Sequence, residues 1–354
     1  FCRGFVEDWS TAQVYTLQNG RGSRGLRSRM TGDWVSGPET LTEEELGANR
    51  RNFYADCLAN KLDTDEFWQS RMPDHSKIKT PMLSTANWGG QGLHPRGNFE
   101  GFVRSASNHK WLEVHGIEHW THFYTDYGID LQKRFFGHFL KGEDTGWLQN
   151  QPKVQLQIRY PGEVFVERHE NEWPLARTDW TKYYIHPDTM TISTEKQVTE
   201  SSAEYGGFSD GLTFLSDPLE ADLEITGPLA SKLWVSSETN DADLFLVLRA
   251  FSPDMKEVTF QGALDPHTPL AQGWLRCSHR KLDKDLTLPY RPYHTHDEIQ
   301  PLNKDETYEV DVEVWPTCIV IPKGYRLGFS VRGKDYVYPG DSGTDFGEYA
   351  GWTG

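Results

Sequence analysis

Hydrophobic positions along the chain follow a helical period before Trp147 and a period of two after it. In the first part, short apolar runs at 81–86 and 111–115 predict buried strands, and the segments 98–107 and 127–140 predict helices. The second helix should carry one apolar face, made of Leu131, Phe135, Phe136, Phe139 and Leu140. Strands that alternate with helices at this spacing predict parallel strands in an α/β sheet.

Two helix-boundary signals accompany this pattern. Thr42 and Glu45 form a T-x-x-E capping box, after which helical spacing predicts an amphipathic helix ending near Asn60. Its apolar face should consist of Leu46, Phe53, Tyr54, Cys57 and Leu58. Gly142 stands where a helix that ends near residue 140 would place a C-cap glycine.

The second part of the chain is rich in alternating strands. Apolar and polar side chains alternate over 154–160, 308–314 and 325–331, so each strand should have one buried and one solvated face. Further strands are predicted at 223–225, 233–235 and 244–251. No long helix is indicated, which favours a β-sandwich or jelly roll. The predicted fold class is therefore α/β plus all-β, with domains at 1–147 and 148–354.

Composition narrows the class of function. The 354 residues carry a net charge of -16, which disfavours binding to nucleic acid or to anionic membranes. No apolar run approaches the roughly 18 residues of a membrane span. The four cysteines are far apart, so we expect buried free thiols rather than a zinc site or disulfides. The cysteine spacing and the absence of an Asn-x-Ser/Thr sequon together indicate a cytoplasmic protein.

Two loops follow the predicted parallel strands, and ligands of open α/β sheets bind at such strand ends. They are Asn87–Gly92 and Gly116–Trp120. His119, in the second loop, is the candidate general base, since the histidine of α/β-hydrolases comes last in chain order. The alternative is a structural or surface histidine. Trp88 and Trp120 are the candidate substrate-binding residues.

A catalytic acid and a nucleophile are harder to find. The first loop offers glycines where an acid is needed, while Glu100 and Glu118 read as a solvated helix residue and a salt-bridge partner. No G-x-S-x-G elbow precedes Pro81, and Arg21–Gly25 lacks its first glycine. The match at Gly207–Gly211, with Ser209, has neither the preceding strand nor the following helix of an elbow.

Three further candidates have weaker support. The segment Gly340–Gly343, with Ser342, looks like a trypsin-type nucleophile segment but lacks the matching histidine and aspartate contexts. Cys57 lies on an apolar helix face, where a small buried side chain is the usual role. The segment His294-x-His296-Asp297 could suggest a metal site, but its two histidines lack a third defined ligand, so no metal site is predicted.

Several stretches nevertheless resemble one family. The β half is similar to the C-terminal domain of X-Pro dipeptidyl-peptidase and of cocaine-esterase-like (CocE/NonD) hydrolases, in the segments 222–228, 236–251, 272–276 and 322–327. The segment 132–146 resembles the helix and linker that close the catalytic domain of that family. The resemblance extends from about Ile78 onward.

The resemblance implies an α/β-hydrolase domain with an inserted helical cap, followed by a jelly roll, and serine-type hydrolysis. His119 falls at the catalytic histidine, and Gly90 stands where the family has an aspartate. The cap would correspond to about residues 35–75. The nucleophile would lie on a segment preceding this chain, which begins with Phe1 rather than Met.

The sequence therefore predicts a serine-type hydrolase of an ester or amide, of the acyl or X-Pro peptide class, without a metal or organic cofactor. A small molecule or peptide is the expected substrate. Another chain segment or a second copy should cover the open sheet edge near 81–86, because an unpaired edge promotes aggregation. The alternative is a catalytically inactive β-sandwich that serves as a binding or assembly module.

Overall fold

The computed structural model describes part of the chain and divides it into two compact units, Phe1–Met72 with Asp341–Gly354, and Pro73–Gly340. The described residues are 31–33, 42, 44–45, 48, 52–117, 119–262 and 266–339. No described helix is long and apolar enough to cross a membrane.

The first unit contains two short described helices, α3 (Phe53–Ala59) and α4 (Glu66–Gln69). The capping box is confirmed: the Thr42 amide donates to the Glu45 carboxylate at 2.8 Å, and the Glu45 amide donates to the Thr42 hydroxyl at 3.2 Å. The predicted helix end is also confirmed, with Asn60 as the C-cap of α3, but the prediction of one helix from the capping box to Asn60 is wrong, because α3 begins at Phe53 with Asn52 as its N-cap. The predicted buried face is wrong for Tyr54 and Leu58, which are 42% and 55% exposed.

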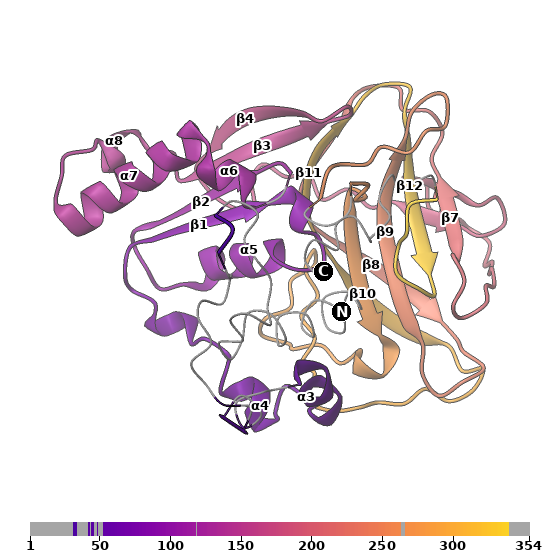
Figure 1. Ribbon diagram of the computed structural model, residues 1–354. Coiled ribbons are helices and arrows are strands. Elements are labelled where there is room, and N and C mark those ends of the chain that lie inside the picture. Colours follow the sequence, from indigo (N-terminus) through magenta and orange to yellow (C-terminus); the bar gives the residue numbers. More distant parts are fainter. Residues whose placement is uncertain are drawn as a thin grey trace. The chain divides into compact units, whose positions relative to one another are not determined.

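The second unit opens with alternating strands and helices (Figure 1). They are η3 (His75–Lys77), β1 (Met82–Asn87), η4 (Trp88–Gly90), α5 (Pro95–Arg104), β2 (Lys110–His115), α6 (Thr121–Tyr124), α7 (Asp126–Lys141) and α8 (Trp147–Asn150). Strand β2 pairs in parallel with β1 on one side and with β3 (Val154–Tyr160) on the other. The predicted parallel arrangement is therefore confirmed.

Side chains of β2 alternate between two helical layers, as the period of a strand requires. Leu112 and Val114 join a core that includes Phe99 and Phe102 of α5. Trp111 instead packs with residues of α7 on the opposite face. Glu113 and His115 share the α7 side with Trp111, so two polar side chains lie under that helix.

Helix α7 ends as predicted, with Gly142 in the left-handed conformation at φ 70°. Its predicted apolar face is only partly confirmed. Leu131 and Phe135 are buried, but Phe136 and Leu140 are 47% and 77% exposed. The buried stripe of α7 is therefore narrower than the run of hydrophobic residues.

The rest of the unit is built from strands. They are β4 (Val164–Glu170), β5 (Tyr184–His186), β6 (Thr191–Ser193), β7 (Leu212–Leu215), β8 (Leu223–Val235), β9 (Asp243–Phe251), β10 (Ala271–Arg276), β11 (Tyr308–Ile321) and β12 (Arg326–Arg332), with a short helix, η5 (Cys277–His279). Hydrogen bonds connect the described strands in the order β1-β2-β3-β11-β10-β9-β12-β7-β6-β5, with β4 on β3 and β8 on β11. The result is a mixed, sheet-rich architecture; the jelly-roll assignment and the boundary at residue 147 stay predictions.

Three strand predictions need correction. In β3 the predicted solvated face is largely buried, since Gln155 and Arg159 are 6% and 0% exposed. The segments 223–225 and 233–235 belong to one long strand, β8, which pairs antiparallel with β11. Strand β12 lies between β9 and β7, and nearly all of its residues are buried. Its polar residues therefore do not mark a solvated face: Ser330 shares a hydrogen bond with Thr213 at 2.8 Å. The predicted alternation is confirmed for the first half of β11.

A buried arginine links β3 to β11. Arg159 has no exposed surface, and its guanidinium donates to the Cys318 carbonyl at 3.1 Å and to the Leu270 carbonyl at 2.9 Å. It also lies over the ring of Phe260, 4.6 Å from the centroid. Burial lowers the pKa of Arg159 to about 10, which leaves it charged at neutral pH. Cys277 and Cys318 are buried free thiols, as predicted, and Cys57 is half-buried.

Candidate functional site

The carboxyl ends of β1 and β2 bring two loops together. Parallel strands end at the same edge of a sheet, and Asn87 is in register with His115 there. The Asn87 side-chain amide donates to the Ile117 carbonyl at 3.1 Å, and the Gly89 amide donates to the same oxygen at 2.9 Å. The loop after β2 is therefore bound to the loop after β1 through one carbonyl.

Close approach of these loops requires a glycine at position 89. A Cβ added there would lie 2.3 Å from the Ile117 oxygen and 2.8 Å from the Gln261 oxygen. Both are backbone atoms, which cannot move aside cheaply. Ile117 itself has φ 43°, an uncommon conformation for a β-branched residue. The loop that leads to His119 is thus held in a specific and strained shape.

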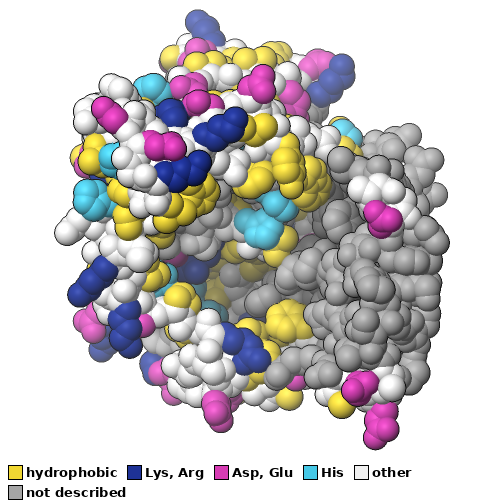
Figure 2. Space-filling model, turned by 60° about the vertical axis from the view of Figure 1, so that its left-hand side comes forward, with side chains coloured by type: hydrophobic (Ala, Val, Ile, Leu, Met, Phe, Trp, Pro, Cys, Tyr) yellow, Lys and Arg dark blue, Asp and Glu magenta, His cyan; other side chains and the backbone are white. Residues whose placement is uncertain are grey.

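His119 is an exposed residue of this loop. Its ring meets that of His94 edge-on, with centroids 4.7 Å apart, and that of Trp120, also at 4.7 Å. Burial, together with the charge of His119, lowers the pKa of His94. A neutral His94 leaves His119 able to accept a proton without repulsion from a cationic neighbour. On the face drawn in Figure 2, histidine and hydrophobic side chains lie side by side.

The two tryptophans of these loops differ. Trp88 is 0% exposed, donates from its indole nitrogen to the Gln157 carbonyl at 2.8 Å, and packs against Phe99. A fully buried ring offers no surface to a ligand, so its predicted substrate contact finds no support. Trp120 is partly exposed beside His119, where it forms the N-cap of α6. Its substrate-binding role stays a prediction.

The carboxylates and serines considered from the sequence do not complete a triad within the described residues. Glu100 pairs with Arg291 and lies 3.8 Å from Arg104, so it is a salt-bridge residue. Ser209 lies in a bend, accepts a hydrogen bond from the Gly211 amide at 3.1 Å, and is followed by strand β7 rather than by a helix. That geometry is not a nucleophile elbow. Glu118, Ser342 and the segment 21–25 lie outside the described residues.

The histidines near residue 295 take structural partners. His294 shares a hydrogen bond with the Asp311 carbonyl at 2.9 Å, and burial lowers its pKa to about 4. Asp297 pairs with Lys281 at 2.8 Å. His296 lies 3.2 Å from His279 between Nδ1 atoms, a neighbour that the sequence spacing did not predict.

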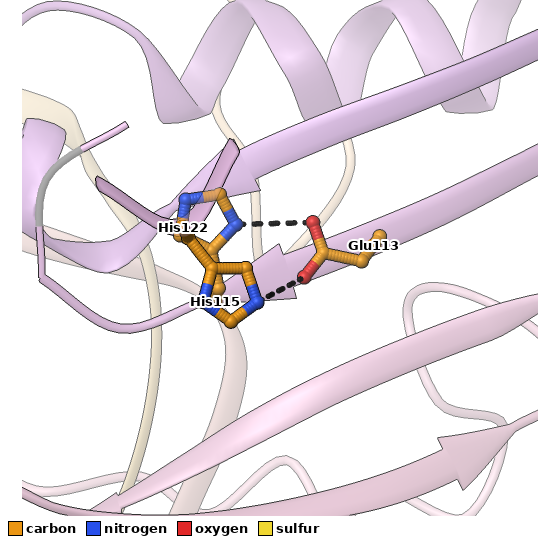
Figure 3. Close-up of side chains that lie close together, drawn as sticks. All are labelled: Glu113, His115 and His122. Atoms are coloured by element: carbon orange, nitrogen blue, oxygen red, sulfur yellow. Dashed lines mark hydrogen bonds and ion pairs between the residues drawn. The ribbon is translucent and has the colours of Figure 1, made fainter. Parts of the chain in front are cut away.

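A second cluster of polar side chains lies beneath α6 and α7, and sequence reasoning missed it. Glu113 and His115 of β2 meet His122 of α6 (Figure 3). The His115 Nδ1 atom is 3.0 Å from Glu113 Oε2, and His122 Nε2 is 3.9 Å from Glu113 Oε1. The two imidazoles stack with centroids 4.5 Å apart. Among the described residues, this is the group of three histidine and carboxylate side chains whose possible ligand atoms lie within 4.8 Å of one another.

The sequence contains the signal for this cluster. In a strand, residues two apart point to the same side, so Glu113-x-His115 places a carboxylate beside an imidazole. Burial and the neighbouring His115 lower the pKa of His122, while Glu113 raises it. Glu113 and His115 interrupt an otherwise apolar strand, and this shared polar face is the signal in the sequence.

Comparison with known proteins adds a family. Residues 145–343 match the family described as X-Pro dipeptidyl-peptidase C-terminal non-catalytic domain. Cocaine esterase of Rhodococcus sp. (strain MB1 Bresler) is 24% identical over 360 residues, covering 84% of this chain and 56% of the esterase. A crystal structure of a CocE/NonD family hydrolase from Staphylococcus aureus has a TM-score of 0.79 at 30% identity, covering 84% of this chain and 55% of that one.

An α-amino acid ester hydrolase structure has a TM-score of 0.59 at 14% identity, a likeness of fold alone. The chain thus spans about half the length of the relatives it matches.

Proposed function

Because the chain belongs to the family of CocE/NonD-like hydrolases that contain the X-Pro dipeptidyl-peptidase C-terminal domain, we propose that it is the histidine-bearing part of a serine hydrolase. The bond cleaved is an ester or an amide of a small acyl or peptide substrate. Residues 1–147 then belong to an α/β-hydrolase domain and residues 148–354 to a jelly roll that walls the active site. The break between the compact units after Met72 supports a cap that ends near residue 75.

The position of His119 carries this proposal. It lies beyond the carboxyl end of β2, where the histidine of an α/β-hydrolase stands. There it takes the proton of the attacking serine and returns it to the leaving group. The low pKa of His94 supports this role, because a second cation at this distance would oppose formation of the imidazolium.

The nucleophile and its oxyanion hole belong to a segment that precedes Phe1. Two observations support this. The chain matches 56% of the length of cocaine esterase, so a protein as long as that esterase has room for a nucleophile elbow before Phe1. In addition, β1 is the last strand on its side of the described sheet, so a further strand can pair with its open edge.

A fluorophosphonate probe, which labels activated serines, tests the proposal on the native polypeptide that contains this chain. We expect labelling of one serine upstream of Phe1 and its loss, by at least about a hundredfold in rate, in His119→Ala, since general-base catalysis is worth roughly 10²–10⁴. Ser209→Ala is the matched control and should label normally.

Two outcomes contradict the proposal. Labelling that disappears in Ser209→Ala would place the nucleophile in the β-rich part. An unlabelled native polypeptide would favour the inactive binding or assembly module.

A further inference from the structure

We propose that Glu113, His115 and His122 bind a divalent transition-metal ion, with Zn²⁺ as the best match, and that this ion fixes both ends of the His119 loop. The site is separate from the chemistry assigned to His119 and stands or falls independently of it. It joins the last residues of β2 to the first turn of α6 (Figure 3).

The donor set suits zinc. Two imidazole nitrogens are ligands of intermediate softness, which favour Zn²⁺ and its first-row neighbours over Ca²⁺ or Mg²⁺, and a carboxylate oxygen completes the two-histidine, one-glutamate set that zinc also takes. The free cysteines Cys277 and Cys318 are in separate parts of the core, so no thiolate competes within this cluster.

The distances also fit. Zinc–nitrogen and zinc–oxygen bonds of about 2.0–2.1 Å in a tetrahedron hold neighbouring ligand atoms roughly 3.3 Å apart. Glu113 Oε2 lies 3.0 Å from His115 Nδ1, and the other oxygen, Oε1, lies 3.9 Å from His122 Nε2; the two distances lie on either side of that value. All three ligand atoms lie within 4.8 Å of one another. Small rotations of the side chains therefore suffice to place them around one ion.

Burial gives an independent reason to expect an occupant. The side chains of Glu113, His115 and His122 are only 3%, 6% and 17% exposed. The Nε2 atom of His122, the nitrogen that faces Glu113, is buried and makes no hydrogen bond among the described residues. Leaving a buried polar atom unsatisfied costs about 1–3 kcal/mol, and coordination would remove that cost for a ligating nitrogen.

The surroundings resemble the outer shell of a metal site. The ring of Tyr127 lies 4.7 Å from that of His122, and its hydroxyl accepts a hydrogen bond from Gln155 at 2.7 Å. Burial first, and then the charges of Glu113 and Glu167, raise the pKa of Tyr127, so its hydroxyl stays a neutral donor beside carboxylates. Such partners orient metal ligands and tune their affinity.

The position of the site gives it a consequence. His115 immediately precedes the loop that carries His119, and His122 follows that loop within the first turn of α6. An ion bound to both histidines closes the loop at its base and restricts the positions that His119 can adopt.

Zinc titration of the metal-stripped 354-residue chain, against a competing chromogenic chelator, tests the proposal. We expect one Zn²⁺ per chain, with binding weakened by at least about tenfold in His122→Ala and in Glu113→Gln, because each removes or weakens a ligand. His169→Ala is the matched control. His169 forms the same Glu-x-His arrangement with Glu167 at 2.8 Å, but on the surface and without a second histidine. The control should bind zinc as the unchanged chain does.

A second measurement does not depend on the folding of any variant. X-ray absorption at the zinc edge of the unchanged chain should show two imidazoles and a carboxylate oxygen as ligands. The proposal is overturned if the chain binds no zinc at equimolar concentration, if binding is unaffected in both variants, or if the absorption spectrum shows sulfur ligands.

Discussion

At the scale of single residues, the histidines of this chain differ in what surrounds them. His294 is largely buried, shares a hydrogen bond with a main-chain carbonyl, and lies near His296 and Arg96, which also disfavour its protonation. His119 is exposed, beside a histidine whose own pKa is lowered. The first is suited to support the fold, and the exposure of the second agrees with its proposed role in proton transfer.

His294 predicts an acid-sensitive stability. Its pKa falls from 6.5 to about 4 in the folded chain, so the unfolded state binds an extra proton between these values. The stability that the neutral form provides is fully present above pH 6.5 and is lost as the pH falls towards 4, by no more than about 3 kcal/mol.

Urea unfolding of the wild-type chain and of His294→Gln, followed across this pH range, measures the effect. The glutamine variant should lose less stability on acidification, because its amide does not titrate. His169→Gln, at an exposed site, should behave like wild type. Parallel pH profiles for all three proteins would contradict the assignment.

The residue scale is also where the sequence was least informative. Trp88 and His119 follow two adjacent strand ends, yet one is fully buried and the other exposed. Loop position alone cannot separate them, because the difference arises from Gln157 and Phe99, which are brought to Trp88 by the fold. His122 likewise reaches Glu113 only because α6 turns back over β2.

At the scale of elements, the loops after β1 and β2 act as one unit. The Ile117 carbonyl accepts hydrogen bonds from both Asn87 and Gly89. Because Gly89 has no side chain, the two loops can approach this closely. A change at Gly89 should therefore disturb His119, although Gly89 does not take part in the chemistry.

Gly89→Ala tests this coupling. A Cβ 2.3 Å from a carbonyl oxygen must push the loops apart, and we expect a loss of about 1–3 kcal/mol in unfolding free energy. Gly101→Ala in α5 is the control, since a Cβ there meets nothing within 4 Å and alanine favours a helix by roughly 0.5–1 kcal/mol.

Chemical denaturation gives the two free energies, and the fluorophosphonate labelling rate of the native polypeptide reports on His119. Equal stability and labelling in Gly89→Ala and wild type would show that the two loops are independent.

Elements with a clear period were predictable and their surroundings were not. β1, β2, β3 and α7 lie within a residue or two of their predicted bounds. For β12, the alternating polar residues predict a solvated face. These residues are buried instead, because strands lie on both sides of β12 and the Ser330 hydroxyl accepts a hydrogen bond from Arg249 at 3.3 Å. A polar residue paired inside a sheet has the same sequence signature as one facing water.

At the scale of the molecule, the strands of the two predicted domains form one hydrogen-bonded sheet. β3 pairs with β2 on one side, contacts β11 on the other, and is joined to it by the buried Arg159. Strands dominate the described chain after Trp147, as the change of hydrophobic period there predicts. The hydrophobic period could not predict that β3 pairs with β11, because the two paired strands are about 160 residues apart in the sequence.

The open edge of β1 yields the last prediction. Strand β1 pairs with β2, and no described strand pairs with its other side. Every second amide of β1 then lacks a main-chain acceptor among the described residues, and an unprotected amide exchanges its hydrogen rapidly.

If a preceding segment supplies both the nucleophile and a neighbouring strand, β1 amides should exchange quickly in the 354-residue chain and at least tenfold more slowly in the native polypeptide. Strand β2, paired on both sides, is the internal control and should be protected in both. Hydrogen–deuterium exchange with mass spectrometry resolves the two strands. Equal protection of β1 in both proteins would mean that the edge is covered within this chain, and the serine would then have to be sought away from a strand adjoining β1.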